Sequence, residues 1–84
     1  MQITLNAAEM EVLFLQDPAT RIEGGFQSFL VRLQGRTDRN TGTLTLTASD
    51  LEKIPRYAFD YGNGGWENRL KSIFERHLGP QLGR

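Results

Sequence analysis

A chain of 84 residues without cysteine has no disulfide framework and no thiolate metal site. Ten basic and ten acidic residues cancel, which argues against a protein that binds nucleic acid by coating phosphates with positive charge. No apolar run is long enough to cross a bilayer, and the first residues lack the pattern of a signal peptide. We therefore expect one cytoplasmic domain, residues 1–84, with no membrane partner.

The first half of the chain reads as a strand followed by two helices. Residues 2–5 alternate polar and apolar side chains, as in a half-buried strand. Asn6 and Glu9 have the spacing of a capping box, which predicts a helix over residues 7–16. A loop over 17–25 leads to a helix over 26–33, which Gly35 is expected to cap. The apolar face of this second helix has helical spacing and comprises Phe26, Phe29, Leu30 and Leu33.

The second half repeats this order. Residues 43–47 alternate as a second strand, and Thr47 or Ser49 is positioned to cap the next helix, Ser49 with full capping-box spacing to Glu52. Pro55 predicts a kink, or the start of a new helix. The last helix covers residues 66–78, and we expect the tail from residue 81 to fray. The stripe expected to be buried on the third helix comprises Leu51, Ile54, Ala58 and Tyr61.

The two halves match position by position. Leu5 corresponds to Leu46, and Glu9 corresponds to Asp50. Further matches pair Phe26 with Trp66, Leu30 with Leu70, Leu33 with Ile73, and Arg36 with Arg76. We interpret residues 1–36 and 43–79 as an internal duplication. The predicted fold is α+β and mainly helical, with two pseudo-symmetric β-α-α units, four helices and a two-stranded antiparallel ribbon. Its expected core comprises Leu5, Leu13, Phe26, Leu30, Leu33, Leu46, Ile54, Trp66, Leu70 and Ile73.

The sequence offers little for catalysis. It has one histidine and no cysteine, and no metal-ligand spacing or nucleotide-binding loop. His77 falls near the end of the last helix, where we interpret it as a boundary residue. Glu9 and Glu11 are two positions apart on a helix, so their carboxyl groups do not converge. We therefore expect a protein that is not an enzyme and has no metal or cofactor.

Two kinds of binding site remain open. Aromatic and arginine residues, which are enriched at protein interfaces, are dense between residues 56 and 66, and three arginines cluster earlier in the chain. The aromatic rings fit a small core as well as an interface. The candidate partner-binding residues are Arg32, Arg36, Arg39, Arg56, Tyr57, Phe59, Asp60 and Asn63.

The alternative is a DNA-binding transcriptional regulator. The third and fourth helices, joined by a glycine-containing turn, have the layout of a helix-turn-helix. The last helix would then read base edges, and its candidate contacts are Asn68, Arg69, Lys71, Ser72 and Arg76. Glu67 and Glu75 on the same helix argue against this alternative, because they repel phosphate.

The stretch Arg56-Tyr57-Ala58-Phe59-Asp60-Tyr61-Gly62-Asn63-Gly64-Gly65-Trp66-Glu67, within residues 50–79, resembles short proteins encoded by temperate phages and prophages. This resemblance carries over no catalytic or binding residue. It implies a setting, since small phage proteins often block host factors, the CRISPR machinery among them. The expected function is a non-enzymatic inhibitor, monomeric or homodimeric. It would occlude a host protein or ribonucleoprotein complex in the host cytoplasm, with DNA as partner only under the alternative.

Overall fold

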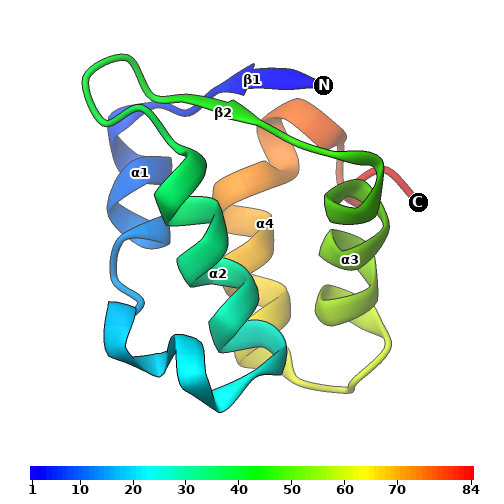
Figure 1. Ribbon diagram of the computed structural model, residues 1–84. Coiled ribbons are helices and arrows are strands. Elements are labelled where there is room, and N and C mark those ends of the chain that lie inside the picture. Colours follow the sequence, from blue (N-terminus) through cyan, green and yellow to red (C-terminus); the bar gives the residue numbers. More distant parts are fainter.

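The computed structural model describes residues 1–84 as a bundle of helices with a two-stranded ribbon across one end (Figure 1). The elements are β1 (Gln2–Thr4), α1 (Ala7–Leu13), η1 (Pro18–Glu23), α2 (Gly25–Arg36), β2 (Thr43–Thr45), α3 (Ala48–Phe59) and α4 (Gly64–Leu78), where η1 is a 3₁₀ helix. The predicted class, α+β and mainly helical, is confirmed. The structure has five helices rather than the predicted four, because the short helix η1 was not predicted.

The ribbon pairs β1 with β2 antiparallel, as predicted. Ile3 lies opposite Leu44, and both side chains point into the core. Beyond the strands the pairing continues, because the Leu5 N–H donates to the Gly42 carbonyl over 2.9 Å. Gly42 has a φ of 78°, and a Cβ there would collide with the Leu5 carbonyl oxygen, so this turn requires glycine.

The first helix begins where the capping box predicts and ends early. The Glu9 N–H donates to Asn6 Oδ1 and the Asn6 N–H donates to Glu9 Oε1, both over 2.8 Å. The helix stops at Leu13 rather than Gln16, and the predicted loop over 17–25 contains η1. Asp17 caps η1 through the Ala19 N–H, and Pro18 occupies its first turn, where a missing N–H costs nothing.

The other helix boundaries follow the sequence prediction only in part. Helix α2 continues through Gly35 to Arg36, and Thr37 forms its cap instead. Helix α3 is capped by Thr47, one of the two predicted residues, and its capping box is completed by Asp50, whereas the alternative box of Ser49 and Glu52 is not formed. It also continues through residue 55 to residue 59 instead of starting anew at the proline. The last helix starts two positions early, at residue 64, under an asparagine cap.

The core lies between the ribbon and the helices. Every expected core residue is buried except Trp66, which is half-buried. Leu82 is also fully buried and the Arg84 guanidinium binds the Asp60 carboxylate at 2.6 Å, so the prediction of a frayed tail was wrong. Tyr61, expected in the stripe of α3, is 56% exposed because α3 ends before it. The other buried apolar residues are Ile3, Phe29, Leu44, Ala58 and Phe74.

Two ion pairs connect the halves at the matched positions. Arg76 of α4 contacts Glu9 of α1 at 2.8 Å, and Arg36 of α2 contacts Asp50 of α3 at 2.6 Å. Both carboxylates also cap their own helices. Burial raises the pKa of Asp50, but hydrogen bonds from Arg36 and Thr47 outweigh it and bring that pKa down to about 2. The duplication itself stays a prediction.

Candidate functional site

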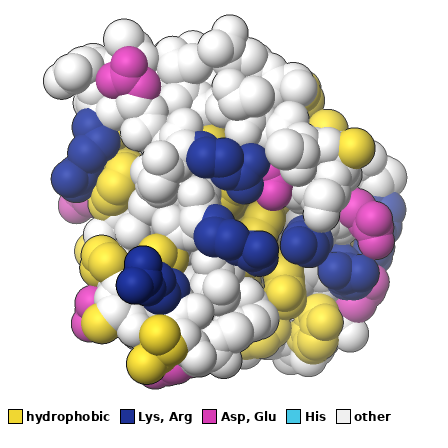
Figure 2. All heavy atoms as spheres, viewed as in Figure 1, with side chains coloured by type: hydrophobic (Ala, Val, Ile, Leu, Met, Phe, Trp, Pro, Cys, Tyr) yellow, Lys and Arg dark blue, Asp and Glu magenta, His cyan; other side chains and the backbone are white.

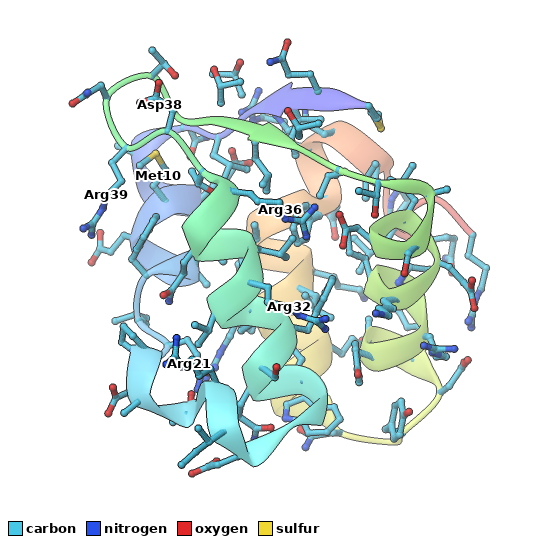
Figure 3. The ribbon with its side chains drawn as sticks, viewed as in Figure 1. Met10, Arg21, Arg32, Arg36, Asp38 and Arg39 are labelled. Carbon is cyan, nitrogen blue, oxygen red and sulfur yellow. The ribbon has the colours of Figure 1, made fainter.

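One face of the molecule combines basic and aromatic side chains from α2 and α3. Arg32 and Arg36 extend from α2 towards α3 (Figure 3). Lys53 and Tyr57 lie three and seven residues after Asp50, so they share the side of α3 that receives Arg36. Arg56 is half-buried beside them. We call these residues, Arg32, Arg36, Lys53, Arg56 and Tyr57, the α2–α3 face.

The α2–α3 face carries more positive than negative charge. Arg36 is paired with Asp50, and Arg56 contacts Glu52 at 3.2 Å. Arg32 and Lys53 take part in none of the ion pairs of the chain. Figure 2 shows Lys and Arg side chains gathered over α2 and α3, with hydrophobic side chains between them. The neutral chain therefore presents a locally cationic surface.

A cluster of aromatic rings packs around Tyr57 beneath the α2–α3 face. Tyr57 packs against Phe26 at 6.0 Å and Phe29 at 5.5 Å between ring centroids, and against Trp66 at 5.9 Å. Its fourth neighbour, Tyr61, stacks on it at 5.5 Å and is more than half exposed. The rings of residues 26 and 66 stack at 4.7 Å. The sequence left open whether these rings belong to the core or to an interface. Most of them pack against the core, and Tyr61 faces solvent.

The structure does not bring all predicted partner-binding residues together. Arg39 lies beyond the end of α2 on the side of α1, where its guanidinium covers the Phe14 ring at 4.1 Å (Figure 3). Phe59 and Asp60 lie at the turn between α3 and α4, where Asp60 pairs with the tail. Asn63 caps α4 by accepting from the Trp66 N–H over 3.1 Å. These residues stabilise the turn and do not join the α2–α3 face.

Most residues proposed for DNA contacts are engaged within the chain. Arg69 donates to Gln16 Oε1 over 2.7 Å, and Lys71 pairs with Glu67 at 3.1 Å. Ser72 donates to the Asn68 carbonyl over 2.9 Å, and the guanidinium of residue 76 holds Glu9. Helices α3 and α4 pack side by side in opposite directions (Figure 1). This hairpin differs from the crossed pair of a helix-turn-helix. The DNA-binding alternative stays a prediction, without a surface of free side chains on α4.

The remaining chemical groups are few. His77 Nε2 lies 2.8 Å from the Thr4 carbonyl oxygen. No group of three or more histidine or acidic side chains is placed to hold a metal ion. None of the helices has both the length and the apolar character that a membrane crossing needs. Two open hollows occur, and neither lies on the α2–α3 face.

Comparison of the chain with protein-family models, with curated proteins and with solved structures gives no match. The α2–α3 face therefore has to be interpreted from its own geometry. The sequence prediction missed one residue of this face and one feature of the aromatic cluster beneath it. Lys53 was missed, although its spacing from Asp50 is visible in the sequence. The exposure of Tyr61 was missed because the end of α3 was not recognised.

Proposed function

We propose that this protein is a non-enzymatic binding module whose α2–α3 face docks onto an acidic surface of a partner protein. The observation that carries this proposal is the pair of uncompensated cations, Arg32 and Lys53, beside the half-buried Tyr57. Arginine binds carboxylates through two parallel hydrogen bonds, and arginine and tyrosine are common at the centres of interfaces.

The face is largely ordered before binding. Two hydrogen bonds of 2.6 and 2.9 Å hold the Arg36 guanidinium on Asp50, and four neighbouring rings fix Tyr57. Side chains that are already fixed lose little entropy on association, which favours affinity. The Nε of Arg56 is buried and has no acceptor within the chain. A partner carboxylate that drew this guanidinium outward would relieve the unsatisfied donor.

A protein surface suits this face better than a nucleic acid. The whole chain has no net charge, so it gains little from the counterion release that supports non-specific nucleic-acid binding. Of the five aromatic rings in the cluster, Phe26 and Phe29 are buried, and Tyr57 and Trp66 are half-buried, so Tyr61 is the only ring exposed enough to stack freely on a base. The resemblance to phage proteins makes a host defence complex the first partner to test, with the module acting as an inhibitor that occludes it.

Affinity capture from a bacterial lysate tests this proposal. The parent protein, an Arg32→Glu/Lys53→Glu variant and a Ser72→Glu variant serve as baits, each with and without nuclease. Ser72 is the control because it occupies the position of α4 that matches residue 32 and is exposed. We expect a stoichiometric protein that survives nuclease, is retained by the parent and the control, and is lost from the double variant.

Two results would contradict the proposal. The first is equal retention of the partner by all three baits, which would move the contact elsewhere on the surface. The second is recovery of nucleic acid that disappears on nuclease treatment, which would favour the DNA-binding alternative. Thermal unfolding of the three baits, measured in parallel, separates a lost contact from a lost fold.

A further inference from the structure

Helices α2 and α3 lie side by side along the α2–α3 face and run in opposite directions (Figure 1). Two contacts fix their alignment. Arg36 meets Asp50 at 2.6 Å, and the ring of Phe29 lies 5.5 Å from the ring of Tyr57. These contacts are seven residues apart on each helix, which is about 10 Å at the rise of an α-helix. The residues midway between the two contacts therefore face each other across the seam of the helices.

The midway residues form an apolar pair below a basic pair. Leu33 and Ile54 are fully buried in the core. Their neighbours Arg32 and Lys53 are exposed and half-buried, and Arg32 extends towards α3 (Figure 3). Neither Arg32 nor Lys53 takes part in an ion pair of the chain. The surface of the seam thus holds two facing cations without a counter-ion.

The two helices have no acidic group left to neutralise these cations. Helix α2 contains no acidic residue. Helix α3 contains two, of which Asp50 is held by Arg36 and Glu52 contacts Arg56 at 3.2 Å. Facing like charges repel, so a carboxylate supplied from outside would both remove this repulsion and gain two ion pairs.

The backbone of this face determines the form of the segment that can supply the carboxylate. An added strand derives its affinity from main-chain hydrogen bonds to an unpaired strand edge. The seam is built from two helices, over residues 25–36 and 48–59, and has no such edge. A helix satisfies its own backbone groups and binds through its side chains alone. A helical segment therefore suits the seam better than an extended one.

We infer that the α2–α3 face binds an acidic, amphipathic helix of the partner protein, laid along the seam. One carboxylate of this helix would lie between Arg32 and Lys53. An apolar side chain within the next two turns would cover Tyr61, which is 56% exposed and stacks on Tyr57 at 5.5 Å. The inference rests on the proposed function and adds to it the form of the partner segment.

Two libraries displayed on beads are the probes, screened against the purified full chain. One randomises a face of a helical hairpin, and the other randomises the same number of positions on a β-hairpin. We expect the helical library to yield binders with an acidic residue and an apolar residue within two turns on one face. They should bind Arg32→Glu/Lys53→Glu at least tenfold more weakly. Replacing their acidic residue by lysine should restore binding to this variant.

A double variant elsewhere on the surface is the matched control. Arg21→Glu/Arg39→Glu makes the same change in net charge at two other arginines that take part in no ion pair. Arg21 belongs to η1, and Arg39 lies on the side of α1. Because the overall charge is equal in the two variants, general attraction of an acidic binder is equal as well. The control should therefore keep the affinity of the parent protein.

Single charge reversals test the facing of the two cations without any binder. Lys53→Glu places a carboxylate opposite Arg32, so it should raise the midpoint of thermal unfolding and weaken the helical binders. Arg32→Glu should do the same, because Lys53 then faces an acid. The two reversals combined should lose this gain in stability, because two acids would face each other. Additive effects of the two reversals would show that the residues do not face each other and would overturn the inference.

The selection has outcomes that overturn the inference and leave the proposed function standing. If only the β-hairpin library yields binders that depend on Arg32 and Lys53, the face takes an acidic segment but not a helix. The inference also fails if no helical binder is enriched, or if the enriched helices are not acidic or are unaffected by Arg32→Glu/Lys53→Glu. The proposed function fails by a different result, which is retention of the partner from lysate by this double variant.

Discussion

The N-termini of α1 and α3 carry the same arrangement in different settings. Each has a carboxylate, Glu9 or Asp50, that caps its own helix and receives an arginine from the other half. Arg76 also donates to the Thr4 carbonyl over 2.8 Å, whereas Arg36 reaches the Thr45 carbonyl only at 3.4 Å. Arg76 therefore divides its hydrogen bonds between the Glu9 carboxylate and the backbone of β1. Arg36 makes both of its short hydrogen bonds to Asp50, whose pKa falls to about 2.

Residues at matched sequence positions therefore need not contribute equally to stability. Asp50 and Glu9 are similarly buried, with side chains 7% exposed. Their arginines differ, since the Arg36 side chain is 37% exposed and the Arg76 side chain is 50% exposed. Solvent weakens an ion pair, so we expect the pair between α2 and α3 to contribute more to stability.

Truncation of matched core residues should give the largest effect. Leu30 and Leu70 are both fully buried, so Leu30→Ala and Leu70→Ala should each lower the free energy of unfolding by about 2–5 kcal/mol. Urea denaturation followed by Trp66 fluorescence measures this. Leu15→Ala is the control, because that side chain is 71% exposed and its loss should be close to neutral. If either buried leucine is tolerated as well as Leu15, the halves are not equivalent in the core.

Removal of the capping carboxylates should be next in size. Asp50→Ala removes a helix cap and leaves the Arg36 guanidinium unpaired, so we expect a loss of about 3 kcal/mol. Glu9→Ala should give a smaller loss, about 1–2 kcal/mol. Arg76 would still donate to the Thr4 carbonyl, and its side chain is more exposed to solvent than that of Arg36. Glu52→Ala removes an exposed acid from α3 and serves as the control. Equal losses for Glu9 and Asp50 would refute the ranking. Denaturation curves at neutral pH decide it.

Acid should separate the two pairs further. The folded pKa of Asp50, about 2, lies below its ordinary value of 3.8, so the unfolded chain binds this proton first. The associated stability, about 2 kcal/mol, is complete above the ordinary pKa and is lost as pH falls towards 2. Thermal unfolding measured between pH 5 and pH 2, in steps of about one pH unit, gives the slope of stability against pH. Asp50→Asn should flatten it more than Glu9→Gln, and an unchanged slope in Asp50→Asn would contradict the assignment.

A surface change in α2 should give the smallest effect, in the opposite direction. Gly35 lies inside α2 with no atom within 4 Å of an added Cβ, and its matched position is Glu75 in α4. Gly35→Ala should therefore raise the free energy of unfolding by about 0.5–1 kcal/mol. Gly42→Ala is the contrasting variant, because its Cβ would meet the Leu5 carbonyl and lower stability. A neutral or destabilising Gly35→Ala would show that α2 ends before that residue.

Local patterns predicted much of the fold. The Asn6–Glu9 spacing located the start of α1, and the apolar repeat from Phe26 to Leu33 located the buried side of α2. Features without a periodic signal were missed. Helix η1 has no buried residue, and Leu82 is a single apolar residue in a glycine-containing tail. Its burial depends on contacts made elsewhere in the chain, which no local window contains.

The candidate site was predictable to a lesser degree. The sequence shows Arg32, Arg36 and Arg39 as one cluster, but only Arg32 and Arg36 extend from α2 towards α3, because Arg39 lies beyond the end of α2. Whether an arginine is free or paired depends on distant residues. Arg36 meets Asp50, and Asp60 meets Arg84, through tertiary contacts that spacing does not encode.

The packing of α1 on α4 has a consequence for how the molecule opens. Helix α1 belongs to the first half and rests on the last helix of the second half, where Glu9 meets Arg76. Neither half can close its own core, so a fragment ending near residue 41 should remain unfolded. Backbone amides of α1 and α4 should exchange with deuterium at one common rate, that of global unfolding. The protein would then behave as a single cooperative unit in which no partially opened form accumulates.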